Sequence, residues 1–129
     1  MEKAVWNVLF NKADDICQPR DLSDTVFAAS VGAALVTEEG NIYKGVNLDT
    51  ACSIGFCAER NAIGSMVTAG ESQISKLVAV RNGQVILPCG VCRELLMQLD
   101  ERNKDMEVLV KLEGYETKRL SQLLPDYWR

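Results

Sequence analysis

The chain has 129 residues, of which 47% are hydrophobic and 25% charged, and its formal net charge is −4. These values are typical of a globular protein with a single core, so we expect residues 1–129 to form one domain. No run of about 18 apolar residues is present to span a membrane, and the first residues lack the pattern of a signal peptide. No cluster of Lys and Arg is present either, which disfavours a nucleic acid polymer as a partner and favours a small-molecule substrate.

The cysteine and histidine counts narrow the chemistry. Five cysteines are an odd number, which fits a reducing cytoplasm better than a disulfide framework. The chain contains no histidine, so it can build neither a Ser-His nor a Cys-His nucleophile. Any general acid or base must therefore be another side chain, and a carboxylate is the natural candidate.

The first half of the chain predicts one helix followed by a hairpin. Hydrophobic spacing and turn residues predict a helix over residues 2–18, a buried strand over 29–37, a turn over 38–41 and a second strand over 42–47. Pro19 ends the helix because a proline cannot continue the hydrogen-bond ladder. Asn47 and Asp49 lie at the end of the second strand. Because side chains alternate along a strand, these two should face the same way, as site residues or as ordinary turn formers.

The second half alternates strands with helices. After a loop over 50–56, the pattern predicts a helix over 57–68, a strand over 75–80, a tight turn at 82–83, a short strand over 84–87 and a helix over 89–99. A strand over 105–111, a turn at 113–114 and a short helix over 120–124 follow. This alternation is typical of an α/β layered domain.

Two cysteine motifs stand at the starts of the two central helices. They are Cys57-Ala58-Glu59-Arg60 and Pro88-Cys89-Gly90-Val91-Cys92. Three thiolates can hold one zinc ion and leave the fourth tetrahedral position open for water. Glu59 follows the first thiol too closely to be a good ligand, but it is well placed to carry protons at the open position. The motifs therefore predict a zinc hydrolase that activates water, with Cys57, Cys89 and Cys92 as ligands.

Three thiolates carry one more negative charge than zinc carries positive charge, so the site needs compensation. The positive ends of the two helices would supply part of it. Arg60, and also Arg93, would donate hydrogen bonds to the sulfurs from just outside the ligand set, unless they are ordinary solvated surface charges.

Two other interpretations of the cysteines compete with a catalytic zinc. Cys89 and Cys92 have the spacing of a dithiol redox pair at a helix N-terminus, but that role leaves Cys57 and Glu59 unused. A purely structural zinc would need a fourth protein ligand, and only Cys17 and Cys52 remain to provide one. A measurement of zinc content would distinguish the interpretation as a metal site from the interpretation as a redox pair.

The chain resembles the small cytidine deaminases of the three-cysteine, tetrameric type. The resemblance rests on Val31-Gly32-Ala33-Ala34-Leu35, Gly45-Val46-Asn47, Cys57-Ala58-Glu59-Arg60, Pro88-Cys89-Gly90-Val91-Cys92-Arg93 and Leu123-Leu124-Pro125. It implies an α/β/α sandwich around a mixed five-stranded sheet, one Zn²⁺ per chain and a homotetramer. It also implies hydrolytic deamination of a free cytosine nucleoside in pyrimidine salvage, with Glu59 as the proton shuttle.

The same resemblance assigns the substrate-binding residues. Asn47 and Asp49 would hold the ribose, and backbone groups at Ala58 and Pro88 would hold the amino group and the base edge. Phe27 lies near the position of an aromatic residue that the family usually has at Ala29.

Other positions depart from the family pattern. Asp49 and Glu94 stand where the family usually has glutamate and glutamine. Tyr127-Trp128 lie close to the C-terminal end of the sequence and resemble the Tyr and Trp near the C-terminus of blasticidin S deaminase, a relative that acts on a modified cytosine nucleoside. Phe27, Tyr127 and Trp128 are candidate lid residues, while the last two are equally suited to packing between subunits. The substrate is therefore cytidine or deoxycytidine, or alternatively a modified nucleoside such as blasticidin S.

Overall fold

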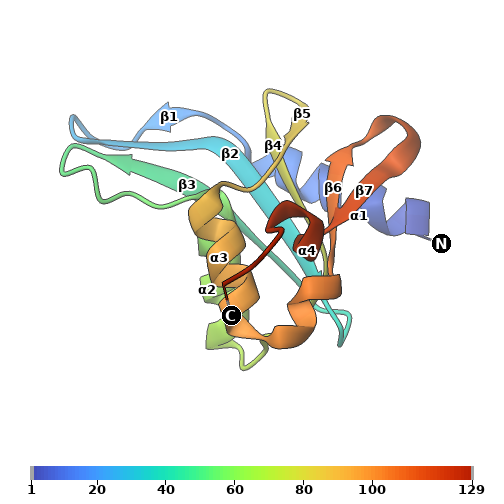
Figure 1. The fold of residues 1–129 in the computed structure, drawn as a ribbon. Coiled ribbons are helices and arrows are strands. Elements are labelled where there is room, and N and C mark those ends of the chain that lie inside the picture. Colours follow the sequence, from blue (N-terminus) through green and yellow to red (C-terminus); the bar gives the residue numbers. More distant parts are fainter. Residues whose placement is uncertain (1, 129) are drawn as a thin grey trace.

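A computed structural model describes residues 2–128 (Figure 1). The helices are α1 (Glu2–Ile16), α2 (Ala58–Thr68), α3 (Gly90–Leu99) and α4 (Leu120–Leu123), with 3-10 turns η1 (Glu101–Asp105) and η2 (Glu113–Tyr115). The strands are β1 (Arg20–Asp21), β2 (Val26–Thr37), β3 (Ile42–Thr50), β4 (Ile74–Arg81), β5 (Gln84–Ile86), β6 (Glu107–Lys111) and β7 (Glu116–Arg119).

The strands form one mixed sheet. Its frame is the five-strand order β3-β2-β4-β6-β7, and the short strands β1 and β5 pair with β2 and β4. Among the strands of residues 2–128, only β4 and β6 pair in parallel, with Lys76 opposite Glu107, and the chain between them passes through α3. The expected α/β fold with a mixed five-stranded sheet is confirmed, with two short additional strands at its margins.

Helices cover both faces of the sheet (Figure 1). On one face Leu77 packs with Leu96 of α3 in a core that also includes α2 and α4. On the other face Val78 packs with Trp6 and Leu9 of α1. Adjacent residues of β4 thus serve opposite cores, as the alternation of a strand requires. Among residues 2–128, no helix has the length and apolar character needed to cross a membrane.

Several element boundaries differ from the sequence prediction, and three of them are in the segments that lead to and form the hairpin. α1 ends at Ile16 rather than at residue 18, since the two residues before Pro19 form turn hydrogen bonds. β2 begins at Val26 and β3 runs to Thr50, because these two residues pair with each other at the far end of the hairpin. Asn47 and Asp49 therefore lie within a strand and not in a loop beyond it, which gives their side chains a fixed direction.

Two strands are missed by sequence reasoning and one turn is confirmed. β7 consists of four exposed polar or charged residues, so it shows no hydrophobic alternation. β1 has only two residues, both exposed. Asn82 and Gly83 have φ values of 51° and 72°, the positive pair that a tight hairpin turn requires.

β2 carries a bulge opposite Asn47. The flanking pairs are Ala28 with Leu48 and Gly32 with Val46, so three residues of β2 face one residue of β3. Ala29 within the bulge is fully buried and has a φ of 67°, a left-handed conformation that costs an alanine about 1–2 kcal/mol. α1 lies close behind, since a Cβ on Gly32 would stand 2.1 Å from the carbonyl oxygen of Ala13. The packed helix and the hydrogen bonds of Asn47 therefore hold the bulge.

Candidate active site

Three cysteine thiols meet where α2 and α3 begin. The Sγ atom of Cys89 lies 3.4 Å from that of Cys57 and 3.6 Å from that of Cys92, and all three lie within 4.8 Å of one another. Ligands at about 2.3 Å around a tetrahedral zinc ion stand about 3.8 Å apart. This spacing and the chemistry of the donor set fit zinc. The three cysteines hold the zinc ion, and three protein ligands leave the fourth position open.

The helix starts put the sulfurs together. Cys57 and Cys89 are the N-cap residues of α2 and α3, both with extended backbone, and Cys92 lies in the first turn of α3. The carbonyl groups of Cys57 and Cys89 accept the first helical hydrogen bonds, from the backbone N–H groups of Asn61 and Arg93 respectively. The sulfurs therefore lie at the positive ends of two helices, which favours the thiolate form.

Burial acts against ionisation of all three thiols. It raises the pKa of Cys57 and Cys92, and neighbouring thiols and the carboxylate of Glu59 add to the effect. For Cys89 burial also opposes ionisation, but hydrogen bonds from the backbone of Cys92 and from the neighbouring thiols lower the pKa overall. A divalent cation offsets this cost because cysteine ligands bind as thiolates.

Glu59 lies in the first turn of α2 and is only 4% exposed. Its side chain borders the same cavity as Cys57 and Cys89. Burial raises the pKa of Glu59, which brings the carboxyl group closer to the range of a proton carrier near neutral pH. No other carboxylate among residues 2–128 combines this burial with a place beside the thiols.

The cavity has a volume of about 410 Å³, enough for a small molecule. Its polar lining is Asn47, Asp49, Thr50 and Ser53 together with Cys57, Glu59 and Cys89, and its apolar walls include Val31, Phe56, Ile86 and Leu87. One cavity therefore contains the metal-binding residues and a further set of polar side chains, Asn47 and Asp49 among them, which we call its second polar end.

Asn47 and Asp49 form the second polar end together. As expected from alternation, they face the same way, and the Nδ2 atom of Asn47 lies 3.4 Å from Oδ2 of Asp49. Asn47 is 8% exposed and also bonds β2, accepting the backbone N–H of Val31 at 2.8 Å and donating to Oγ of Ser30 at 2.9 Å. Asp49 is exposed and faces the cavity.

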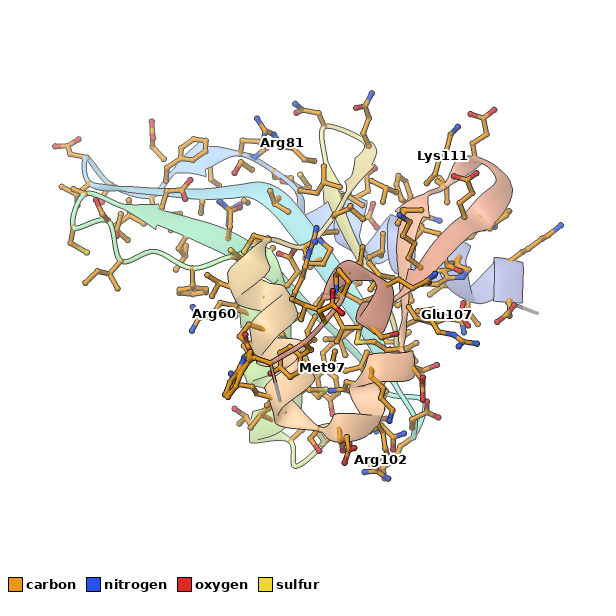
Figure 2. The ribbon with its side chains drawn as sticks, viewed as in Figure 1. Arg60, Arg81, Met97, Arg102, Glu107 and Lys111 are labelled. Carbon is orange, nitrogen blue, oxygen red and sulfur yellow. The ribbon has the colours of Figure 1, made fainter. Side chains whose placement is uncertain are left out.

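Of the remaining residues predicted to act near the metal, some lie beside the cavity or the cysteine-bearing turn and others do not. Ala58 is buried and lines the cavity, whereas Pro88 is buried outside the lining and its carbonyl accepts a 2.7 Å hydrogen bond from Nε of Arg93. Arg93 also donates to the carbonyl of Leu123. Arg60 is exposed and projects outward from α2 (Figure 2), and among the described residues no hydrogen bond joins it to a thiol. The structure thus places Arg93, not Arg60, beside the cysteine-bearing turn.

The three candidate lid residues lie outside the cavity of their own chain. Phe27 is half-buried on β2, opposite Asp49 in the ladder. The Tyr127 hydroxyl and the Trp128 indole N–H both donate to the carboxylate of Glu94 on α3, and their rings stand 5.9 Å apart. This contact lowers the pKa of Glu94. The C-terminal aromatic pair therefore packs on the outer surface of α3.

Sequence reasoning missed the residues that form the walls and the support of the site. Ile86 lies on the short β5 strand, where no periodicity marks its direction. Ser30 bonds Asn47 from within the bulge, and a bulge disrupts the alternation from which a side-chain direction is inferred. A serine within a run of alanines, valine and glycine was the only available signal.

Comparisons with known proteins agree with this geometry. Residues 16–107 match the model of the cytidine and deoxycytidylate deaminase zinc-binding region. A blasticidin-S deaminase from Bacillus cereus is 34% identical over 106 residues, covering 74% of this chain and 74% of that protein. A cytidine deaminase from Sporosarcina psychrophila is 37% identical over 99 residues, covering 74% and 71%.

Solved structures share the fold over nearly the whole chain. The crystal structure of cytidine deaminase from Mycobacterium tuberculosis has a TM-score of 0.78 at 25% identity and covers 96% of this chain and 97% of that one. The cytidine deaminase from Burkholderia pseudomallei has a TM-score of 0.73 at 29% identity and covers 93% and 96%. With its three-cysteine zinc site and this family match, the chain belongs to the cytidine and deoxycytidylate deaminase family.

Proposed function

We propose that the chain is a zinc-dependent hydrolase that converts a free cytosine nucleoside, cytidine or deoxycytidine, into the uracil nucleoside and ammonia. The observation that carries this proposal is the single cavity that joins Glu59 and the zinc-binding thiols to Asn47 and Asp49. Its two ends match a substrate with an aminated ring and a polar sugar. The cytidine deaminases among its relatives support the same reaction.

Zinc, when bound, supplies Lewis acidity and lowers the pKa of water in its open position. Glu59 accepts a proton from the water that attacks C4 of the ring and delivers a proton to N3. It then carries the second proton to the departing amino group, so that the C4–N bond breaks and ammonia leaves. Burial raises the pKa of Glu59 toward the working pH, so the side chain is suited both to accept a proton and to donate one.

The other residues bind and orient the substrate. The exposed carboxylate of Asp49 would accept hydrogen bonds from sugar hydroxyl groups, with Asn47 beside it. Backbone groups at Ala58 would hold the amino end of the base, since this residue borders the cavity. Pro88 would act on the base edge through the backbone turn that leads into α3. Arg60 is exposed, so any influence on the thiolates would act at a distance and not through a hydrogen bond.

Ammonia release from cytidine and deoxycytidine by the zinc-loaded protein tests the proposal. We expect turnover by the wild-type protein and its loss in Glu59→Gln, a variant that keeps the size of the side chain. Absence of turnover by a wild-type protein that contains zinc would exclude these two substrates.

A modified cytosine nucleoside such as blasticidin S is the second candidate. It is favoured by the 34% identity to the blasticidin-S deaminase of Bacillus cereus and by the shorter Asp49 carboxylate at the sugar end. Ammonia release from blasticidin S, compared with cytidine under the same conditions, distinguishes the two. A non-catalytic zinc module or a thiol-redox pair would release ammonia from neither.

We also propose a cytoplasmic homotetramer in which Phe27, Tyr127 and Trp128 contribute to lids or subunit contacts. Large apolar side chains remain exposed in the loop before α2, on α3 and after α4, with Ile54 at 82%, Val91 at 58% and Trp128 at 70%. The free cysteines fit a reducing compartment. Light scattering should give a mass four times the 14.3 kDa of one chain.

A further inference from the structure

We propose that Ser30 is a positioning residue for sugar recognition, acting through Asn47 from within the β2 bulge. Ser30 does not border the cavity, whereas Asn47, Asp49 and Val31 do. Its hydroxyl oxygen accepts a 2.9 Å hydrogen bond from Nδ2 of Asn47. This role rests on the proposed deamination of a nucleoside.

Two groups of β2 set the orientation of the Asn47 carboxamide. The backbone N–H of Val31 donates to Oδ1 at 2.8 Å, so the oxygen of the amide must point toward β2. Nδ2 carries two hydrogens, and Ser30 accepts one of them. The remaining N–H is directed to Oδ2 of Asp49, 3.4 Å away. Ser30 thereby decides which hydrogen of Asn47 is left for the carboxylate and the sugar.

The bulge makes this arrangement rigid. Three residues of β2 stand opposite one residue of β3, which brings both Ser30 and the Val31 N–H within reach of a single side chain. The thiol of Cys17, just beyond α1, donates to the Ser30 carbonyl at 3.3 Å. Ala29 keeps its φ of 67° while fully buried, which occurs where the surroundings hold the backbone firmly. Because the backbone of the bulge is held in place, the Ser30 hydroxyl can fix the orientation of the Asn47 carboxamide.

Removal of the hydroxyl should weaken sugar binding and spare the chemistry. In Ser30→Ala one hydrogen of Asn47 loses its acceptor, and the amide no longer holds Asp49 in a single position. We expect KM for cytidine to rise about fivefold to tenfold, the size of one hydrogen bond, with kcat within about twofold. For 1-methylcytosine, which keeps a substituted ring and lacks the sugar, kcat/KM should stay within about twofold of the wild-type value.

A matched pair of variants isolates the hydroxyl from the packing. Thr and Val have nearly the same shape, so Ser30→Thr keeps the acceptor and Ser30→Val removes it. Ser30→Thr should retain a KM for cytidine several-fold lower than that of Ser30→Val. Comparison of KM between Ser30→Thr and Ser30→Val tests the role of the hydroxyl even if Ser30→Ala folds poorly. Ser121→Ala, an exposed serine of α4, is the control for preparation and assay.

Either of two results would overturn the role of Ser30. Equal losses of kcat/KM on cytidine and 1-methylcytosine would make the residue merely structural, and unchanged KM for cytidine in both Ser30→Ala and Ser30→Val would remove it from recognition. The assay of the wild-type protein tests the proposed deaminase function separately from the role of Ser30. Failure of the wild-type protein to deaminate any cytosine nucleoside would refute the proposed function itself.

Discussion

The Sγ atoms of Cys57 and Cys89 lie 3.4 Å apart, although 32 positions separate these cysteines along the chain. Each is the N-cap of a helix, and residues of both helices pack in one hydrophobic core on one face of the sheet. Cys92 completes the set from the first turn of α3. Because the sulfurs come from the starts of two packed helices, the fold itself brings the three ligands together.

The first prediction concerns zinc content. The purified wild-type protein should contain about one zinc per chain, and Cys57→Ala, Cys89→Ala or Cys92→Ala should each lower this severalfold because a thiolate ligand is lost. Cys52→Ala, an exposed cysteine outside the cluster, should keep the wild-type zinc content. Elemental analysis by mass spectrometry gives the ratio. Full zinc retention in all three ligand variants would contradict the assignment.

The second prediction separates proton transfer from metal binding. Glu59→Gln should reduce kcat by about 10²-fold to 10⁴-fold, the usual contribution of a general acid–base group, while zinc content is unchanged. The amide keeps the size of the carboxylate in its buried place but cannot carry a proton. Activity within about tenfold of wild type in a zinc-replete variant would assign proton transfer elsewhere.

The third prediction concerns the sugar end of the cavity. Asp49→Ala should lower kcat/KM for cytidine by at least about tenfold, because a charged hydrogen-bond acceptor for the sugar is lost. Turnover of 1-methylcytosine should change by less than about twofold. Asp24→Ala, an exposed carboxylate away from the cavity lining, is the matched control. Equal losses on the two substrates would show that Asp49 does not recognise the sugar.

The fourth prediction concerns the stability of the fold. Asn103 is fully buried, accepts the backbone N–H of Ile74 at 2.8 Å and donates to the carbonyls of Ser72 and Leu96 at 3.0 Å. Asn103→Ala leaves these backbone groups without partners and should lower the free energy of unfolding by about 2–4 kcal/mol.

Urea denaturation of the zinc-loaded protein measures this loss. Asn11→Ala, at an exposed position of α1, should change the free energy of unfolding by less than about 0.5 kcal/mol. A similarly small change for Asn103→Ala would mean that the backbone groups find other partners.

The fifth prediction concerns pH. The side chain of Arg102, with further help from its backbone N–H and from Ser72, holds the pKa of Asp100 at about 2, below its ordinary value of 3.8. Because the folded-state pKa is the lower one, the ionised carboxylate stabilises the fold above about pH 4, and this contribution is lost as the pH falls from 4 toward 2.

Asp100→Asn tests this sign. The variant should be less stable than wild type at pH 7, and the difference should shrink at pH 3, as measured by urea denaturation at both values. A difference that is constant with pH would show that the ionised form of Asp100 contributes nothing. Figure 2 shows Arg102 near the surface, so added salt should reduce the effect.

Local sequence was sufficient wherever a function depends on short spacing. Cys89 and Cys92 are three residues apart, so one helical turn must bring them together, and Glu59 lies two residues beyond Cys57, in the first turn of the helix that Cys57 caps. The metal ligands, the candidate proton carrier and the layered α/β fold could therefore be predicted from motifs and periodicity. The shared direction of Asn47 and Asp49 also followed from the alternation of a strand.

Long-range packing decided the rest. No pattern reveals that three residues of β2 stand opposite Asn47, because a bulge is defined by the register of two strands. The same holds for Arg60 and Arg93, which look alike in sequence, yet only Arg93 reaches the turn at Pro88. Tyr127 and Trp128 meet Glu94 across 33 and 34 positions. The sequence by itself determined which residues are the candidates for the chemistry, whereas tertiary structure determined how their supporting side chains are held, because packing brings together residues that local spacing cannot relate.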